Sequence, residues 1–202
     1  MTVDQRPSEG LEAYRYRQVG QVQLYLGDAR QVLAAMPGAC VDSIVTSPPF
    51  WSLRDYGTGA WRDGDPACAH PLPADRRTAG AHCADCGAVW TDPQYGLEPT
   101  VEDYVTNLVD VFTEARRVLT PTGTCWLNLG DSYTGGGRRA HTTTGPGQAT
   151  VGDQPAARLP AKHLIGVPWR VAFALQASGW WLRNAVIWSK TNHLSPFCLC
   201  CS

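Results

Sequence analysis

Residues 46–51, Thr-Ser-Pro-Pro-Phe-Trp, combine hydrogen-bond acceptors with aromatic rings. The hydroxyl oxygen of Ser47 and the carbonyl oxygen of Pro48 can each accept one hydrogen of a planar amino group. Pro49 forces Pro48 into an extended conformation, and neither proline has an amide N–H, so the direction of that carbonyl is fixed. Phe50 or Trp51 can stack on a base that has left its duplex. The segment therefore predicts a binding site for an exocyclic amine. The Ser-Pro-Pro sequence alone is equally typical of a turn.

An exocyclic amine on cytosine or adenine is a poor nucleophile because its lone pair is delocalised into the ring. Hydrogen bonds that pull both N–H groups out of the ring plane restore lone-pair character on the nitrogen. Ser47 and Pro48 are the natural pair of acceptors for this purpose. The segment is thus a candidate catalytic motif for a transfer to nitrogen.

A second group of residues has the spacing of a metal site. A Cys-x-His pair, Cys68 and His70, is followed after twelve residues by a Cys-x-x-Cys pair, Cys83 and Cys86. Four soft ligands on two short arms suit tetrahedral zinc, and a filled shell makes the site structural. His82 is another candidate ligand, and unrelated free thiols in a loop would explain the same residues.

Two further observations bear on this cysteine–histidine group. The segment 61–98 is poor in apolar residues, so it needs a metal or another staple to hold itself together. A zinc nucleobase deaminase is excluded because His70 is followed by Pro71 and Leu72, so the His-x-Glu signature is absent. Cys40 and Cys125 lie beside or inside apolar segments, and we expect both to be core thiols.

The elements that position these residues alternate along the chain. Strands are predicted at 21–27, 41–46, 124–129 and 180–188, from alternating or continuous apolar runs. Helices are predicted after Asp28, over 101–119 with a Thr100 capping box, and from Pro168 to 178–179. The segment 61–98 reads as an insertion, and 133–159 reads as a mobile loop. This order predicts an α/β domain with a mostly parallel sheet.

Length and charge narrow the class of protein. The chain has 202 residues and a formal charge of −1, which suits one domain and gives no global attraction to nucleic acid. Any DNA contact must therefore come from local patches, such as the arginine pairs at 76–77, 116–117 and 138–139. No apolar run approaches the roughly 20 residues of a membrane span, and the N-terminus has no signal core. We expect a cytoplasmic protein without membrane contact.

Four ordered blocks resemble one family. Residues 45–57, with the Ser-Pro-Pro-Phe motif, are similar to the catalytic segment of amino-group DNA methyltransferases of the N4-cytosine/N6-adenine class, of bacterial or phage type. Residues 96–100 resemble the family segment before its helix, 126–133 the end of its next strand, and 162–170 with 180–190 its last helix and strand. The likeness covers most of residues 20–192.

The resemblance implies a methyl donor, a substrate and residue roles. The donor would be S-adenosylmethionine, the partner DNA with a flipped-out base, and the fold a partial Rossmann-like sheet with a zinc-binding insertion. Ser47, Pro48, Pro49 and Phe50 would form the catalytic motif. Asp28 matches an acidic position near the donor's adenosine, while it equally suits a helix cap. Serine in the first motif position favours cytosine N4 over adenine N6.

The donor half of such an enzyme is missing from the sequence pattern. A glycine-rich turn should follow a strand, yet the run Gly135–Gly137 lies in a polar loop. In the permuted order common in this family, that motif lies C-terminal to the catalytic motif. Residues 193–202 depart from the family, and their cysteine-rich sequence is typical of translation past a frameshift. A second metal site in this segment is the less favoured interpretation. The missing strands would leave a sheet edge uncovered beside 21–46.

We therefore expect one incomplete methyltransferase domain over 1–202, with its zinc insertion at 61–98, its loop at 133–159 and an atypical tail at 193–202. A separate polypeptide could supply the donor-binding half. The setting would be restriction–modification or a phage genome. Two other functions stay open: a DNA-binding remnant without activity, and a methyltransferase acting on RNA or on a protein glutamine.

Overall fold

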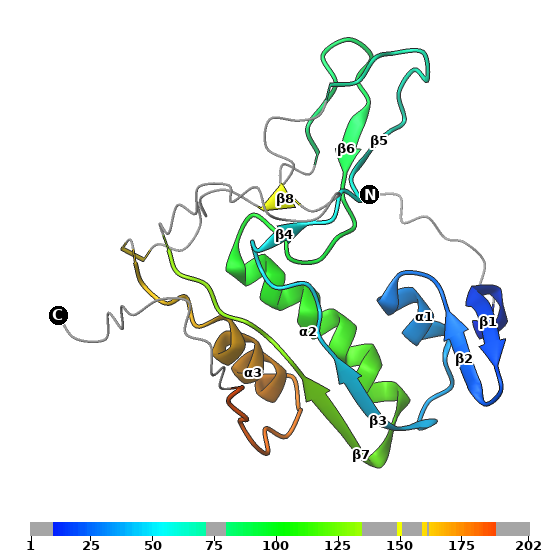
Figure 1. Cartoon of the computed structure of the whole chain (residues 1–202), viewed down its shortest axis with the longest axis vertical. Coiled ribbons are helices and arrows are strands. Elements are labelled where there is room, and N and C mark those ends of the chain that lie inside the picture. The colour runs from blue at the N-terminus through cyan, green and yellow to red at the C-terminus, as the bar shows by residue number, and fades with distance from the viewer. Residues whose placement is uncertain (1–9, 72–79, 135–148, 151–158, 161, 189–202) are drawn as a thin grey trace.

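A parallel pair of strands forms the centre of the structure, which is a computed structural model describing residues 10–71, 80–134, 149–150, 159–160 and 162–188. Strand β3 (Val41–Thr46) pairs with β7 (Leu119–Leu127), with Ser43 opposite Thr124 and Thr46 opposite Leu127. The chain between them contains helix α2 (Val101–Val118), which makes a crossover connection of the kind that parallel strands require. Helices and strands thus form a mixed α/β arrangement, as predicted (Figure 1).

Helix α2 buries one face against this pair and against helix α3 (Val167–Ala177). The capping box is present, because the Thr100 hydroxyl accepts from the Asp103 amide at 3.0 Å. The apolar residues spaced three and four apart point into the core, with Leu108 and Phe112 almost fully buried. Helix α3 carries a proline in its first turn, as its sequence predicted.

Among the described residues, one face of the parallel pair is covered and the other is not. Ile44 of β3 and Cys125 and Leu127 of β7 pack against the α2–α3 core. Val45 and Trp126, which point to the opposite face, are 80% and 58% exposed. Burial raises the pKa of the Cys125 thiol to about 11, in keeping with a core position.

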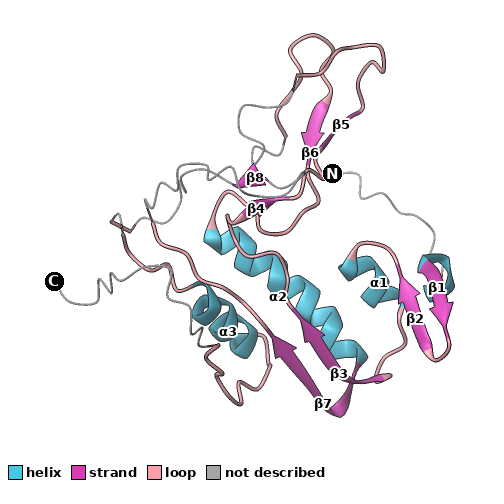
Figure 2. Ribbon diagram, in the orientation of Figure 1, coloured by secondary structure: helices cyan, strands magenta, loops and turns pink. Residues whose placement is uncertain are grey.

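The N-terminal part differs from the prediction. The strand expected at 21–27 is β2 (Val22–Tyr25), but it pairs in antiparallel fashion with β1 (Arg15–Val19), a strand that the sequence analysis missed. These two strands form a hairpin of their own beside helix α1 (Ala29–Ala35) (Figure 2). Val22 and Leu24 are consequently exposed. The alternation of apolar residues correctly predicted a strand, but this strand has no buried face.

The remaining strands are short and antiparallel. Strand β5 (Ala60–Arg62) pairs with β6 (Val89–Thr91), and this hairpin projects away from the rest of the described chain (Figure 1). Strand β4 (Arg54–Asp55) pairs with β8 (Ala149–Thr150). A short 3-10 helix, η1 (Leu11–Tyr14), precedes β1. The mostly parallel sheet is therefore reduced, within the described residues, to the single β3–β7 pair.

Several other predicted features differ from the structure or lie outside its described residues. Residues 180–188 form no strand, because no described segment lies beside them to complete a ladder, and Trp181 and Trp188 are exposed. Cys40 is exposed as well, with its thiol 3.0 Å from the Pro37 carbonyl, so its assignment to the core was wrong. Most of 133–159 and all of 193–202 lie outside the described residues. None of the helices that the structure describes has the length and apolarity for crossing a bilayer.

Candidate functional site

Ser47 lies directly after the C-terminal end of β3, and Asn128 lies directly after the end of the neighbouring β7. Because parallel strands end at the same edge, these two side chains meet: the Asn128 amide donates to the Ser47 hydroxyl oxygen at 3.2 Å. The Asn128 backbone N–H also donates to the Thr46 carbonyl at 2.9 Å, which continues the ladder by one step. Ser47 is exposed, so its remaining hydrogen-bonding capacity is accessible.

The loop 47–50 is held from behind by helix α2. The hydroxyl of Tyr104 donates to the Pro49 carbonyl at 2.9 Å, and Tyr104 is completely buried. Desolvation in the core raises the pKa of this phenol, so it remains a hydrogen-bond donor. The bond fixes the peptide that follows the Pro48 carbonyl, the expected second acceptor for an amine.

The segment that returns from the insertion holds the same loop from another side. The Ser52 N–H donates to the Gly96 carbonyl at 2.7 Å, and the indole N–H of Trp51 donates to the Glu98 carbonyl at 3.0 Å. Gly96 has a φ of +92°, and a side chain there would come within 2.9 Å of the Phe50 carbonyl. Glycine is therefore required at Gly96 both for its backbone conformation and for the close approach.

The two aromatic residues of the motif have different positions. Trp51 is only 2% exposed and belongs to the hydrophobic core, so the option that it stacks on a base was wrong. Phe50 is half-buried, and its ring lies over Gly130, where an added Cβ would be 2.6 Å from two ring atoms. Phe50 is the remaining candidate for stacking.

Asp28 takes the structural role that its sequence allowed. Its carboxylate accepts from the Gln31 N–H at 3.1 Å and caps α1. The backbone of the neighbouring Gly27 leaves no open space for a ligand, since an added Cβ would lie 2.7 Å from the ring of Tyr14. Contact between Asp28 and a methyl donor stays a prediction, and the Gly135–Gly137 run lies outside the described residues.

The cysteine–histidine group is brought together by the β5–β6 insertion. One ligand atom from each of Cys68, His70, Cys83 and Cys86 lies within 4.8 Å of all the others. His82 is not part of this cluster; its Nδ1 is 3.5 Å from the Gly87 carbonyl. The predicted four residues are thus adjacent in space, as a shared metal ion requires.

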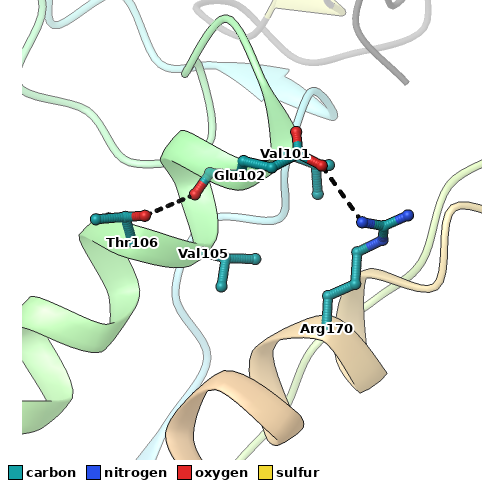
Figure 3. A pocket seen from close by; sticks show the side chains of 5 residues that line it. All are labelled: Val101, Glu102, Val105, Thr106 and Arg170. Atoms are coloured by element: carbon teal, nitrogen blue, oxygen red, sulfur yellow. Dashed lines mark hydrogen bonds and ion pairs between the residues drawn. The ribbon is translucent and has the colours of Figure 1, made fainter. Parts of the chain in front are cut away.

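A small pocket between α2 and α3 has a volume of about 260 Å³ and is lined by Val101, Glu102, Val105, Thr106 and Arg170 (Figure 3). An ion pair of 3.3 Å joins the Arg170 guanidinium to the Glu102 carboxylate at its rim. None of the catalytic-motif residues lines this pocket. We therefore assign it to the packing of two helices rather than to the candidate site.

Comparison with known proteins decides the family. Residues 41–198 match the sequence profile of the DNA methylase family, of N6/N4-methyltransferase type. The chain belongs to this family. The match includes the Ser47–Asn128 junction and the cysteine–histidine cluster, whereas Asp28 precedes it.

Curated relatives agree with the family. The chain is 39% identical over 173 residues to the type II methyltransferase M.SmaI of Serratia marcescens, and 40% identical over 173 residues to M.Cfr9I of Citrobacter freundii. Each alignment covers 84% of this chain, and 48% and 46% of those relatives, respectively. The chain therefore spans about half the length of the curated relatives it matches. No solved structure matches it significantly.

Three residues of the candidate site were not singled out from the sequence. Asn128 and Tyr104 position the motif, and Asp131 accepts from the Gly166 and Val167 N–H groups at 3.0 Å, which caps α3. A usable signal existed for Asn128 and Asp131, since polar residues at or just after the C-terminal end of a predicted parallel strand lie at the functional edge of an α/β sheet. Tyr104 carried no such signal within the apolar face of its helix.

Proposed function

We propose that this chain carries the amine-gripping half of an S-adenosylmethionine-dependent DNA methyltransferase that modifies an exocyclic amine, with cytosine N4 favoured over adenine N6. The single observation that carries the proposal is the placement of Ser47 at the end of β3, hydrogen-bonded to Asn128 at the end of β7. Membership of the DNA methylase family supports the same reaction.

Different residues of the loop contact the amine and the ring of a flipped base. The Ser47 hydroxyl and the Pro48 carbonyl each accept one N–H of the amine, which raises the availability of the nitrogen lone pair. The Phe50 ring stacks on the base and excludes water from one side of it. The Tyr104 and Asn128 hydrogen bonds keep both acceptors in place without contacting the base themselves.

The glycines that follow β2 and β7 leave no open backbone for the methyl donor. Asp28 is one candidate contact, but its neighbour Gly27 is closed off by Tyr14, and Gly130 is covered by Phe50. A donor site needs open glycine backbone after a strand, and neither Gly27 after β2 nor Gly130 after β7 provides it. S-adenosylmethionine would then be held by residues outside the described ranges or by a separate polypeptide, and we derive no step through it.

The test measures transfer of a radiolabelled methyl group from S-adenosylmethionine to DNA, with RNA and protein as competing acceptors. We expect label in DNA, recovered mainly as N4-methylcytosine after digestion, and about a hundredfold less with Ser47→Ala. Label only in RNA or protein would overturn the substrate assignment. DNA binding without any incorporation, even with a donor-binding polypeptide added, would support the inactive DNA-binding alternative.

A further inference from the structure

The cysteine–histidine cluster has the dimensions of an occupied metal site rather than of a disulfide. The sulfur atoms of Cys68 and Cys83 are 3.9 Å apart. Two thiolates bound to one tetrahedral zinc at about 2.3 Å each would be about 3.8 Å apart. A disulfide requires about 2.0 Å between sulfur atoms. His70 Nε2 lies 3.0 Å from the Cys86 sulfur, and the four ligand atoms all lie within 4.8 Å of one another.

The backbone around the cluster is shaped to present these four atoms. The Gly87 N–H donates to the Cys83 carbonyl at 2.9 Å, and Gly87 has a φ of +75°, so the Cys-x-x-Cys arm closes in a tight turn. The Cys68 N–H donates to the Asp65 carbonyl at 3.0 Å, which turns the first arm. The His70 ring stacks on Trp61 with centroids 5.5 Å apart. Each ligand is thus oriented by a contact other than the metal.

The insertion has little else to hold it together. Its strands β5 and β6 are three residues long each, and a lone two-stranded hairpin is marginally stable in water. Among its described residues, the buried apolar side chains are those of Cys83, Ala88, Trp90 and Leu97. Small units of this kind are commonly folded by their metal.

The same insertion is connected to the catalytic loop by hydrogen bonds. Leaving β6, the chain presents Asp92, which accepts from the Thr58 hydroxyl at 2.6 Å. Gln94 follows, accepting from the Tyr56 N–H at 2.7 Å and donating to the Arg54 carbonyl at 2.8 Å. Residues 92–94, which follow Cys86 in the chain, therefore make hydrogen bonds to residues 54–58, which follow the amine-gripping motif.

We propose that Cys68, His70, Cys83 and Cys86 bind one structural zinc ion, and that this ion orders residues 52–58 through Asp92, Gln94 and Gly96. The metal performs no chemistry, because four protein ligands leave no open position for water or substrate. The proposal does not depend on the methyl-transfer reaction.

Metal content and ligand geometry test the site. We expect one equivalent of zinc per chain by elemental analysis, and the intense visible absorption of tetrahedral thiolate-bound cobalt after exchange with Co²⁺. Cys86→Ser should lose both signals, while the matched control Cys40→Ser keeps them. A chain with Cys198, Cys200 and Cys201 all replaced by serine should also keep them. Less than half an equivalent of zinc in the wild-type chain, or unchanged binding in Cys86→Ser, would overturn the site.

Amide hydrogen exchange on the wild-type chain tests the coupling without relying on a variant that must fold. Removal of zinc by a chelator should raise exchange at Ser52 and Tyr56 about tenfold or more, with α3 unchanged, and added zinc should restore it. Exchange that rises only within 61–91 would refute the coupling while leaving the metal site intact.

Discussion

The amide of Asn128 donates to the hydroxyl oxygen of Ser47 at 3.2 Å, across the ends of two parallel strands, and the two residues are 81 positions apart in the sequence. The bond uses one of the two lone pairs on the Ser47 oxygen. The second lone pair and the O–H group remain available for other partners. Asn128 is therefore a positioning residue for the proposed catalytic serine.

Asn128→Asp should lower methyl transfer about three- to tenfold, because the carboxylate has no N–H to donate to Ser47. Asn128→Ala should give the same loss. Both changes should act on kcat more than on KM for DNA, since the base is still bound but its amine is gripped less well. Steady-state kinetics on an oligonucleotide substrate check this, and a full-rate Asn128→Asp variant would contradict the positioning role.

Tyr104→Phe should reduce the free energy of unfolding by about 1–2 kcal/mol, because it removes the bond to the Pro49 carbonyl and leaves that oxygen unpaired beside the core. Urea denaturation measures the change. Tyr25→Phe is the matched control: its hydroxyl bonds to Gln23 on the hairpin surface, and we expect less than about 0.5 kcal/mol. Equal effects of the two substitutions would argue against a special role for Tyr104.

Gly130→Ala should displace the Phe50 ring, since the new Cβ would lie 2.6 Å from two of its atoms. We expect a loss of about 1–3 kcal/mol in stability and weaker binding of DNA that carries an extruded base. Fluorescence anisotropy with such an oligonucleotide tests the second effect. Gly10→Ala has no neighbour within 4 Å and should change neither quantity.

Substitutions at Asp28 separate its two roles. Asp28→Ala should cost about 1 kcal/mol by removing the cap of α1, while Asp28→Asn should keep most of the stability because asparagine caps equally well. If the carboxylate also contacts the donor, both variants should bind S-adenosylmethionine more weakly, by isothermal calorimetry. Donor affinity that is unchanged in Asp28→Asn would leave only the capping role.

Glu98 should contribute more to the free energy of unfolding in acid than at neutral pH. Burial is the main cause that raises the pKa of its carboxyl in the folded chain, although Asn107 donates to it. The folded state therefore holds this proton more tightly than the unfolded state, whose glutamate pKa is about 4.3. The contribution is complete below that value and is lost as pH rises through the raised folded pKa. The stability difference between wild type and Glu98→Gln should fall over this range, whereas a difference independent of pH would contradict the assignment.

The predictable parts of the fold were those encoded by local patterns. The capping box at Thr100 and the three- and four-residue spacing along 101–118 located α2, and Asp28 located α1. The strand at 41–46 was equally well marked, as was the start of α3 near Pro168. These signals depend on neighbours within one or two turns, so they are legible without the tertiary structure.

The errors concern partners rather than elements. Val22 and Leu24 alternate as a buried strand would, but their partner is the preceding segment 15–19, which left them exposed. Residues 180–188 are apolar enough for a strand, and no described segment pairs with them. Trp51 looked available for stacking because its neighbours form the motif, yet its indole is buried against α2. Pairing and burial depend on segments far away in the chain, which local periodicity does not report.

The sequence by itself determined the chemical groups: a serine and a proline carbonyl suited to an amine, and four soft ligands at the spacing of a zinc site. Tertiary structure alone decided which groups meet. It joined Asn128 to Ser47 across two strand ends, placed Tyr104 behind Pro49, and brought Cys68 and Cys83 to 3.9 Å. The physical reason is that residue types fix hydrogen-bonding and coordination capacity, whereas distances between remote residues are set by strand pairing and helix packing.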